Sequence, residues 1–237
     1  MVPAMTQRHP AVKRLPHEEV SVEARTVEAT FPDPLLVMQH DPDSPQAAAY
    51  RVLGHRVTRP AGMRALMVTS AEGCDGKTTC AINLAMALSE GGRATVLLVE
   101  ANLRRPGIAR ALGFEPPLCF EAQLTAHKEQ PMSPWTIARV TQWMHVVAVN
   151  PITLTGAKMI DALGVELAIE HFKRLPYDFI VVDTPAVLGQ ADVTLMHDCV
   201  DGVLLTGIAG ESDGIAIREA TQLLAPSNIL GLALLEG

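Results

Sequence analysis

The chain has 237 residues, of which 48% are apolar and only 4% aromatic, so its core must be built mainly from aliphatic side chains. Its formal net charge of −7 excludes the global basic field that attracts nucleic acid, so we expect no nucleic-acid partner. Its four cysteines are scattered, and no apolar run approaches the roughly 18 residues that span a membrane. These features predict a cytoplasmic protein without a direct membrane span.

The N-terminal part of the chain differs from the rest. Residues 1–45 hold seven of the seventeen prolines and a single aromatic residue, Phe31. Such a segment buries too little apolar surface to offset its ordering entropy, so residues 1–44 are predicted to form a disordered or draped tail. Ser44 followed by Pro45 is typical of a helix start, with a capping hydroxyl and then proline at the first helical position. A folded domain is therefore expected over 45–237, opening with a helix at 45–58.

From residue 64 onward, continuous apolar runs alternate with helical patterns. The expected strands are 64–70, 94–100, 144–149, 178–183, 202–207 and 229–235. The expected helices are 77–90, 106–112, 158–174, 190–197 and 213–225. Runs without polar alternation indicate strands that are buried on both faces, so the pattern predicts an α/β fold, a doubly wound and mainly parallel sheet. Prolines interrupt any period in the 113–143 stretch, which gives no clear prediction.

The segment AEGCDGKTT at residues 71–79 lies between the first predicted strand and the helix at 77–90. Backbone amides at such a helix start point into one concavity and bind phosphate oxygens. The residues expected to bind a nucleotide are Gly73, Cys74, Asp75, Gly76, Lys77, Thr78 and Thr79. Lys77 is expected on the β- and γ-phosphates, and the Thr78 hydroxyl on Mg²⁺. The first position of the P-loop pattern is Ala71 in place of glycine, and the alternative is an ordinary tight turn with an exposed lysine.

The segment FIVVDTP places Asp183 at the end of a predicted strand. Ligands of open α/β sheets bind at the carboxyl ends of the strands, so this carboxylate is expected to hold Mg²⁺, usually through water. The alternative is that Asp183 only caps the following turn.

Three segments together carry a family resemblance: VTSAEGCDGKTTCAINLAMAL at 68–88, VLLVEANLRRP at 96–106 and YDFIVVDTPA at 177–186. In this order and spacing they resemble the bacterial tyrosine-kinase family, the cytoplasmic kinases of capsule and exopolysaccharide export. That family shares a P-loop branch with the Min and Par partitioning ATPases. The resemblance covers residues 35–235 and implies ATP and Mg²⁺ as cofactors. It also implies a membrane-anchored polysaccharide co-polymerase or export protein as partner, recruitment to the inner face of the cell membrane, and a homo-oligomer.

The resemblance also implies roles for two residues after the strand at 94–100. The family has two aspartates there, which position Mg²⁺ and activate the attacking hydroxyl; the matching residues are Glu100 and Asn102. The implied catalytic residues are therefore Lys77, Glu100, Asn102 and Asp183, and the implied metal ligands are Thr78, Asp183 and Glu100. Asn102 cannot act as a base and has lost a negative charge, so Mg²⁺ should be held more weakly than in relatives.

Further departures concern other family positions. The ring-forming Glu-x-x-Arg-x-x-Arg motif of the first helix reads Ala48, Arg51 and Gly54 here, and the residue that reads adenine is matched by Leu235. Glu72 stands where partitioning ATPases carry a signature lysine. The family's C-terminal tyrosine cluster has no counterpart in the sequence.

Three functions remain open on this basis. The first hypothesis is an ATP-dependent kinase of the tyrosine-kinase type that acts on proteins of polysaccharide synthesis or export. Alternatively, it is a catalytically degraded relative that binds nucleotide, or only keeps the fold, and regulates a membrane partner by contact. The third hypothesis is a positioning ATPase of the Min and Par type.

Overall fold

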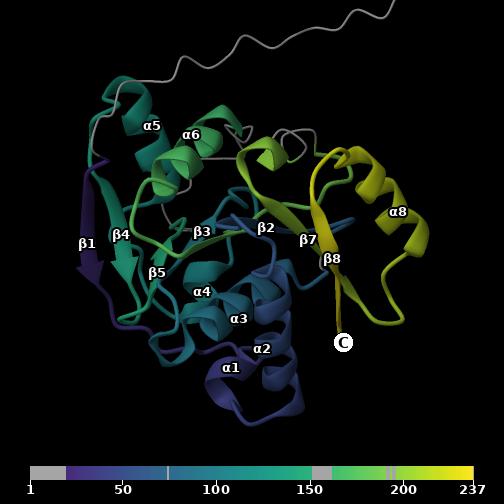
Figure 1. Cartoon of the computed structure of the whole chain (residues 1–237). Helices are drawn as coiled ribbons and strands as arrows, with labels where there is room; N and C mark the ends of the chain where they lie inside the picture. The colour runs from purple at the N-terminus through teal and green to yellow at the C-terminus, as the bar shows by residue number, and fades with distance from the viewer. Residues whose placement is uncertain (1–19, 74, 151–161, 191–192, 194–195, 237) are drawn as a thin grey trace, which may run out of the picture.

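In the computed structural model, residues 20–73, 75–150, 162–190, 193 and 196–236 are described. They form an eight-stranded sheet in the order β1-β4-β5-β3-β6-β2-β7-β8 (Figure 1). The strands are β1 (Val22–Thr26), β2 (Ala65–Ser70), β3 (Val96–Glu100), β4 (Trp135–Arg139), β5 (Met144–Val147), β6 (Phe179–Asp183), β7 (Gly202–Ile208) and β8 (Ile229–Leu235). Neighbouring strands are parallel except for the β4–β5 pair, which is antiparallel.

Helices cover both faces of the sheet. They are α1 (Val37–His40), α2 (Pro45–Val57), α3 (Lys77–Ser89), α4 (Ile108–Leu112), α5 (Phe120–Glu129), α6 (Ala162–Phe172) and α8 (Gly214–Leu223). In Figure 1, α1 to α4 lie below the sheet, and α5 and α6 lie above it. The expected doubly wound, mainly parallel α/β fold is confirmed.

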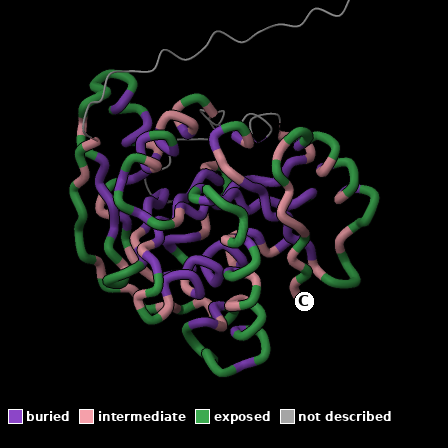
Figure 2. The backbone as a smooth tube through the Cα atoms, in the orientation of Figure 1, coloured by how far each residue is buried: buried purple, intermediate pink, exposed green. Residues whose placement is uncertain are grey.

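Two apolar cores explain why the central strands read as continuous hydrophobic runs. On β2, Leu66 and Val68 pack with α3 and α4, whereas Met67 packs with the core under α5 and α6. Successive side chains of a strand point to opposite faces, so a strand covered on both faces needs apolar residues at every position. Figure 2 shows the resulting buried centre, with exposed residues in the loops, on the outer helix faces and along the edge strand β1.

Helix α2 begins where the sequence predicts. The Ser44 side chain accepts a hydrogen bond from the Ala47 amide at 3.1 Å, and Pro45 occupies the first helical position. The helix packs closely on α3: a Cβ added to Gly54 would lie 3.2 Å from Leu88 Cδ2. The Arg51 guanidinium also bonds the Glu90 carboxylate just after α3. The arginine left from the family's ring motif is thus engaged within its own chain.

The sequence predicts a disordered or draped N-terminal segment, and its described part, residues 20–44, is ordered and lies along the domain. Val22–Thr26 forms an edge strand parallel to β4, and Leu36 is fully buried. The Asn83 side chain of α3 holds this region by donating to the Leu35 carbonyl and accepting from the Met38 amide. An edge strand with mostly exposed side chains has no apolar run, which explains why composition alone failed here. Residues 1–19 lie outside the described part, so the tail prediction stays untested there.

The six expected strands are confirmed within two residues at each end, and so are the helices at 45–58, 77–90, 106–112 and 213–225. The expected helix at 158–174 is seen as α6, with 158–161 outside the described residues. The helix expected at 190–197 also lies partly outside them. β4 and α5, both within the 113–143 stretch, were not predicted.

Candidate nucleotide-binding site

The candidate site lies at the carboxyl edge of the central strands. β2 runs directly into the phosphate loop (residues 71–79), while β3 and β6 end at Glu100 and Asp183. These two carboxylates are register partners on neighbouring strands. The sheet order places β6 between β2 and β3, so all three strand ends meet at one edge, where open α/β folds bind ligands.

The phosphate loop ends in the N-terminus of α3. Gly76 caps the helix with a left-handed backbone (φ 69°), which glycine adopts without a Cβ penalty. A Cβ at this position would also collide with the Leu235 side chain of β8. The loop therefore requires glycine at residue 76, and the loop residues Gly73, Gly76 and Thr79 line a cavity at the start of the helix. Cys74, one of the expected binding residues, lies outside the described residues.

Lys77 folds back over the loop. Its ammonium donates to Ser70 Oγ at 3.0 Å and to the Glu72 carbonyl at 3.4 Å, and the residue is only 7% exposed. Lys77 also lines the cavity beside the loop. Sequence reasoning placed Lys77 correctly in the loop but did not identify Ser70 as its neighbour.

The Thr78 hydroxyl meets Asp183 across the edge of the sheet. Thr78 Oγ1 donates to Asp183 Oδ2 at 2.7 Å, while the buried Asp183 Oδ1 has no hydrogen-bond partner among the described residues. Burial raises the pKa of the Asp183 carboxyl to about 7; the Thr78 hydrogen bond and the Lys77 charge oppose this rise, and the charge of Glu100 adds to it. An orphaned carboxylate oxygen beside a hydroxyl is a pair of hard oxygen donors, which suits a Mg²⁺ ion that keeps most of its water ligands. The residues present therefore fit Mg²⁺, and the turn-cap alternative for Asp183 does not account for the orphaned oxygen.

Glu100 has a different arrangement from the one implied by the resemblance. Its Oε1 accepts from the Gly107 and Ile108 amides at 2.5 and 2.8 Å, and its Oε2 accepts from the Val149 amide at 2.8 Å. Burial raises the pKa of Glu100 to about 7, against the lowering effect of the three amides. Both Glu100 oxygens are engaged by backbone amides in this arrangement, which leaves its implied roles as catalytic residue and metal ligand without support from the geometry.

A second wall of the site is the segment after β3, called here the arginine loop (residues 101–107). Asn102, Arg104 and Arg105 of this loop line the cavity. Asn102 Oδ1 also accepts from the Arg105 amide at 3.3 Å, so the side chain stabilises the turn of its own loop. The role of Asn102 in catalysis stays a prediction.

Asp75 anchors the outer side of the phosphate loop. Its Oδ1 accepts from the Ser212 hydroxyl at 2.9 Å, and its Oδ2 accepts from the Glu72 amide at 3.3 Å. Ser212 Oγ in turn accepts from the Ile208 amide at the end of β7. Ser212 carried no sequence signal, because it is 137 residues from its partner and outside any motif.

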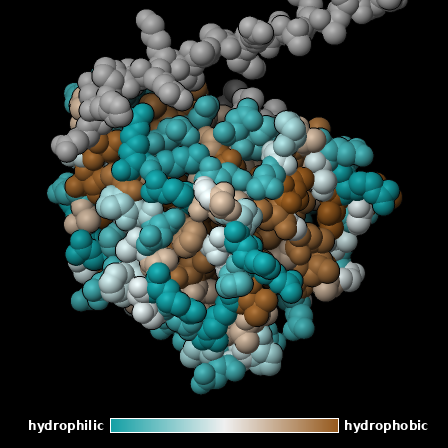
Figure 3. All heavy atoms as spheres, in the orientation of Figure 1, coloured by the Kyte–Doolittle hydropathy of each residue, from teal (hydrophilic) through white to brown (hydrophobic). Residues whose placement is uncertain are grey.

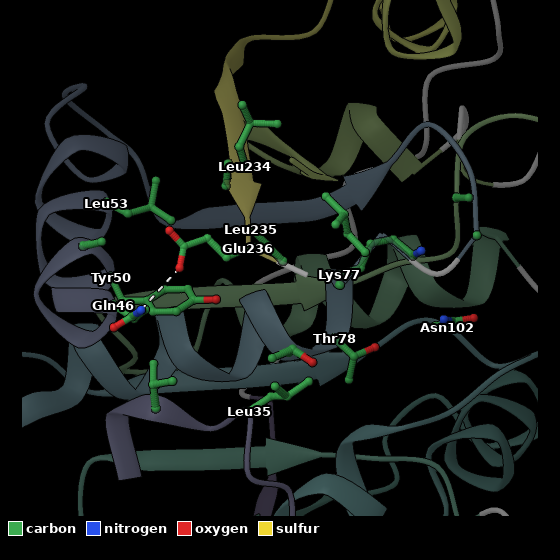
Figure 4. A pocket seen from close by; sticks show the side chains of 18 of the residues that line it. Leu35, Gln46, Tyr50, Leu53, Lys77, Thr78, Asn102, Leu234, Leu235 and Glu236 are labelled. Carbon is green, nitrogen blue, oxygen red and sulfur yellow. Dashed lines mark hydrogen bonds between the residues drawn. The ribbon is translucent and has the colours of Figure 1, made fainter. Parts of the chain in front are cut away.

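A cavity of about 1490 Å³ joins the phosphate loop to a groove between α2 and β8. In Figure 4, Gln46, Tyr50 and Leu53 of α2 lie on one side, and Lys77, Thr78 and Asn102 lie on the other. The groove carries exposed apolar side chains, namely Leu35, Val52 and Leu234, which are 62%, 52% and 61% exposed. Figure 3 shows hydrophobic atoms gathered where β7 and β8 lie in Figure 1. The polar end of the cavity suits phosphates and the apolar end suits an apolar group.

Comparisons with known proteins bear on the family and the fold of this chain. Residues 63–232 match the family model ParA, described as NUBPL iron-transfer P-loop NTPase. The chain is 30% identical over 172 residues to tyrosine-protein kinase YwqD of Bacillus subtilis (strain 168), covering 71% of this chain and 70% of that protein.

Two solved structures show the same fold. The kinase domain of the Escherichia coli tyrosine kinase ETK superposes with a TM-score of 0.66 at 22% identity, covering 86% of this chain and 80% of that one. The septum site-determining protein MinD of Pyrococcus horikoshii OT3, complexed with Mg-ADP, gives a TM-score of 0.57 at 25% identity, covering 73% and 70%.

The fold and the phosphate loop define a P-loop NTPase of the Min/Par-like branch. Within that class, the chain belongs to the bacterial tyrosine-kinase family. In the part of the chain that the structure describes, no helix combines the length and apolarity needed to cross a membrane.

Proposed function

We propose that this protein binds ATP with Mg²⁺ in the phosphate loop and transfers phosphate to a partner protein, as a kinase of the tyrosine-kinase type. The observation that carries the proposal is the Thr78–Asp183 pair beside the buried Lys77 at the start of α3. Lys77 would contact the β- and γ-phosphates, and Thr78 and Asp183 would hold the metal ion. Mg²⁺, when bound, neutralises charge on the phosphates.

In the transfer itself, the acceptor hydroxyl oxygen would form a bond to the γ-phosphorus, and the bond from that phosphorus to the bridging oxygen of ADP would break. The acceptor proton needs a base. Asn102 cannot take it, and both Glu100 oxygens are occupied by backbone amides. Asp183, with a pKa of about 7, is an ionisable carboxyl at this edge, although its place in the proposed metal site favours a ligand role.

The lack of an evident base favours a second candidate, a degraded relative that binds nucleotide and regulates its partner by contact. Its supporting observations are the engagement of Glu100 with three amides and the exposed apolar groove beside the phosphate loop. For both candidates we propose a membrane-anchored partner of polysaccharide synthesis or export, met at the inner face of the cell membrane by a cytoplasmic protein. A homo-oligomer built through the family's ring motif is disfavoured, since Arg51 pairs with Glu90 in its own chain. A positioning ATPase ranks last because of Glu72.

Radiolabelled ATP and Mg²⁺, incubated with purified protein and a bacterial extract, separate the two main candidates. The matched variants are Lys77→Ala and Lys128→Ala, the latter on the exposed face of α5 on the other side of the sheet. A kinase gives a labelled protein with the wild type and Lys128→Ala but not with Lys77→Ala. Nucleotide binding by calorimetry without any Lys77-dependent label would leave the contact regulator. Absence of nucleotide binding would overturn both and leave only the relative that keeps the fold without a nucleotide.

A further inference from the structure

The arginine loop lies close to the phosphate loop at two points. A Cβ added to Gly107 would lie 3.3 Å from Thr78 Cγ2, and one added to Gly73 would lie 3.8 Å from Arg105 Nη1. Arg104 and Arg105 are exposed and line the same cavity as Lys77. The position of this loop therefore decides where two guanidinium groups stand relative to bound phosphates.

Asn102 stabilises the turn within this loop, and the Glu100 side chain holds the end of the loop to the sheet. Glu100 stands immediately before the loop, and its Oε1 holds the Gly107 and Ile108 amides at the end of the same loop. Its Oε2 accepts from the Val149 amide, two residues after the end of β5, which connects the loop to the segment that follows this strand. Each of these amides needs a hydrogen-bond acceptor in the folded protein, because an unpaired buried amide is destabilising.

We propose that Glu100 is a positioning residue, which clasps the arginine loop against the phosphate loop so that Arg104 and Arg105 face the phosphates of the nucleotide. The inference rests on the nucleotide binding proposed above. It gives Glu100 a role that acts through the arginine loop and requires neither contact with a metal ion nor with the reacting hydroxyl.

The length of the side chain is central to this role. Glu100→Asp keeps the charge but removes one methylene. The shorter carboxylate would no longer reach the Gly107 and Ile108 amides and the Val149 amide at the same time. Glu100→Gln keeps the length but turns an NH₂ group toward at least one backbone amide, which then has no acceptor. Both variants should therefore loosen the arginine loop, although only one of them loses the charge.

The test is calorimetric titration of ADP into the full chain, once with Mg²⁺ and once with EDTA. The clasp predicts that Glu100→Asp and Glu100→Gln weaken ADP binding by a similar factor, about tenfold, in both conditions. If Glu100 is instead a metal ligand, another pattern is expected. Glu100→Asp then retains or increases the gain in ADP affinity that Mg²⁺ provides. Glu100→Gln abolishes this gain and leaves ADP affinity in EDTA unchanged. The second pattern would overturn the proposal.

Arg105→Ala supplies a variant whose folding is not in question, because Arg105 is exposed. It should weaken ADP binding in the wild type and have almost no further effect in the Glu100→Asp background, since the loop is then already displaced. Additive effects of the two substitutions would contradict the clasp. Asp178→Asn is the matched control: Asp178 also accepts a backbone amide, that of Thr95, and it precedes the amino end of β6. It should leave ADP affinity unchanged.

Hydrogen exchange in the ligand-free protein separates failure of the clasp from failure of the proposed function. In Glu100→Asp the amides of Gly107, Ile108 and Val149 should exchange at least about tenfold faster, while the amides of β2 keep their protection. A wild type that binds no ADP but shows this pattern would reject the proposed function and keep the clasp. Unchanged exchange at all three amides would reject the clasp alone.

Discussion

The ends of β3 and β6 carry two carboxylates that differ mainly in their partners. Glu100 and Asp183 are register neighbours, both fully buried, and burial raises the pKa of each to about 7. Glu100 accepts three backbone amides, whereas Asp183 accepts one hydroxyl and keeps an oxygen without a partner in the described structure. Position at the edge of the sheet is thus insufficient to assign a catalytic role. The hydrogen-bond partners decide which carboxylate remains available to a ligand.

The largest effect is expected from Lys77→Ala, which removes the cation whose charge acts on Asp183 at the end of β6. ADP affinity should fall about 100-fold, because a charge-assisted hydrogen bond to phosphate is lost. Calorimetry measures the change, with Lys128→Ala as control. Equal affinities of wild type and Lys77→Ala would remove the basis for a phosphate cradle.

Neutralising the β3 carboxylate should destabilise the fold. In Glu100→Gln at least one buried amide loses its acceptor, so the free energy of unfolding should fall by about 2 kcal/mol at neutral pH. Urea denaturation measures this value. A variant as stable as the wild type would mean that the three amides find other acceptors.

Neutralising the β6 carboxylate should have the opposite sign. Asp183→Asn still accepts from Thr78 but removes a buried charge, so unfolding should require about 2 kcal/mol more at pH 8. Because the folded pKa, about 7, lies above the ordinary 3.8, the charge destabilises the wild type progressively as pH rises between these values. The advantage of the variant should therefore shrink as pH falls from 7 toward 4. Thermal unfolding at several pH values tests this, and a pH-independent difference would contradict the assigned cause.

The smallest effect is expected from Asn102→Asp, which gives the β3 end a carboxylate that lines the cavity. Mg²⁺-dependent ADP binding should strengthen about threefold, since one unit charge is added at the edge that would hold the ion and the cost of burying this charge offsets most of the attraction. Binding in EDTA should weaken slightly, because the new charge repels phosphate. Titrations in both conditions measure the two effects, and a loss of affinity with Mg²⁺ present would place Asn102 away from the ion.

Sequence reasoning recovered features with local causes. Continuous apolar runs indicated the six inner and C-terminal strands, and Ser44 with Pro45 marked the start of α2. The order of strand, phosphate loop and helix identified Lys77, Thr78 and Asp183 as one site, which the Thr78–Asp183 hydrogen bond bears out as a spatial grouping.

What the sequence did not reveal depends on distant partners. The role of Glu100 is set by the Val149 amide, 49 residues away, and the anchoring of Asp75 by Ser212, 137 residues away. No residue pattern reports a side chain that bonds backbone amides of a remote segment. β1 and β4 escaped prediction because one is largely exposed and the other lies among prolines, so neither shows a clean apolar run.

The most direct test is a crystal structure of the full chain with ADP and Mn²⁺, in which anomalous scattering locates the ion in place of Mg²⁺. We predict an anomalous peak beside Thr78 and Asp183, with the Glu100 carboxylate still bonded to the amides of Gly107, Ile108 and Val149. An ion ligated by Glu100, with those amides released, would contradict the distinction between the two strand ends.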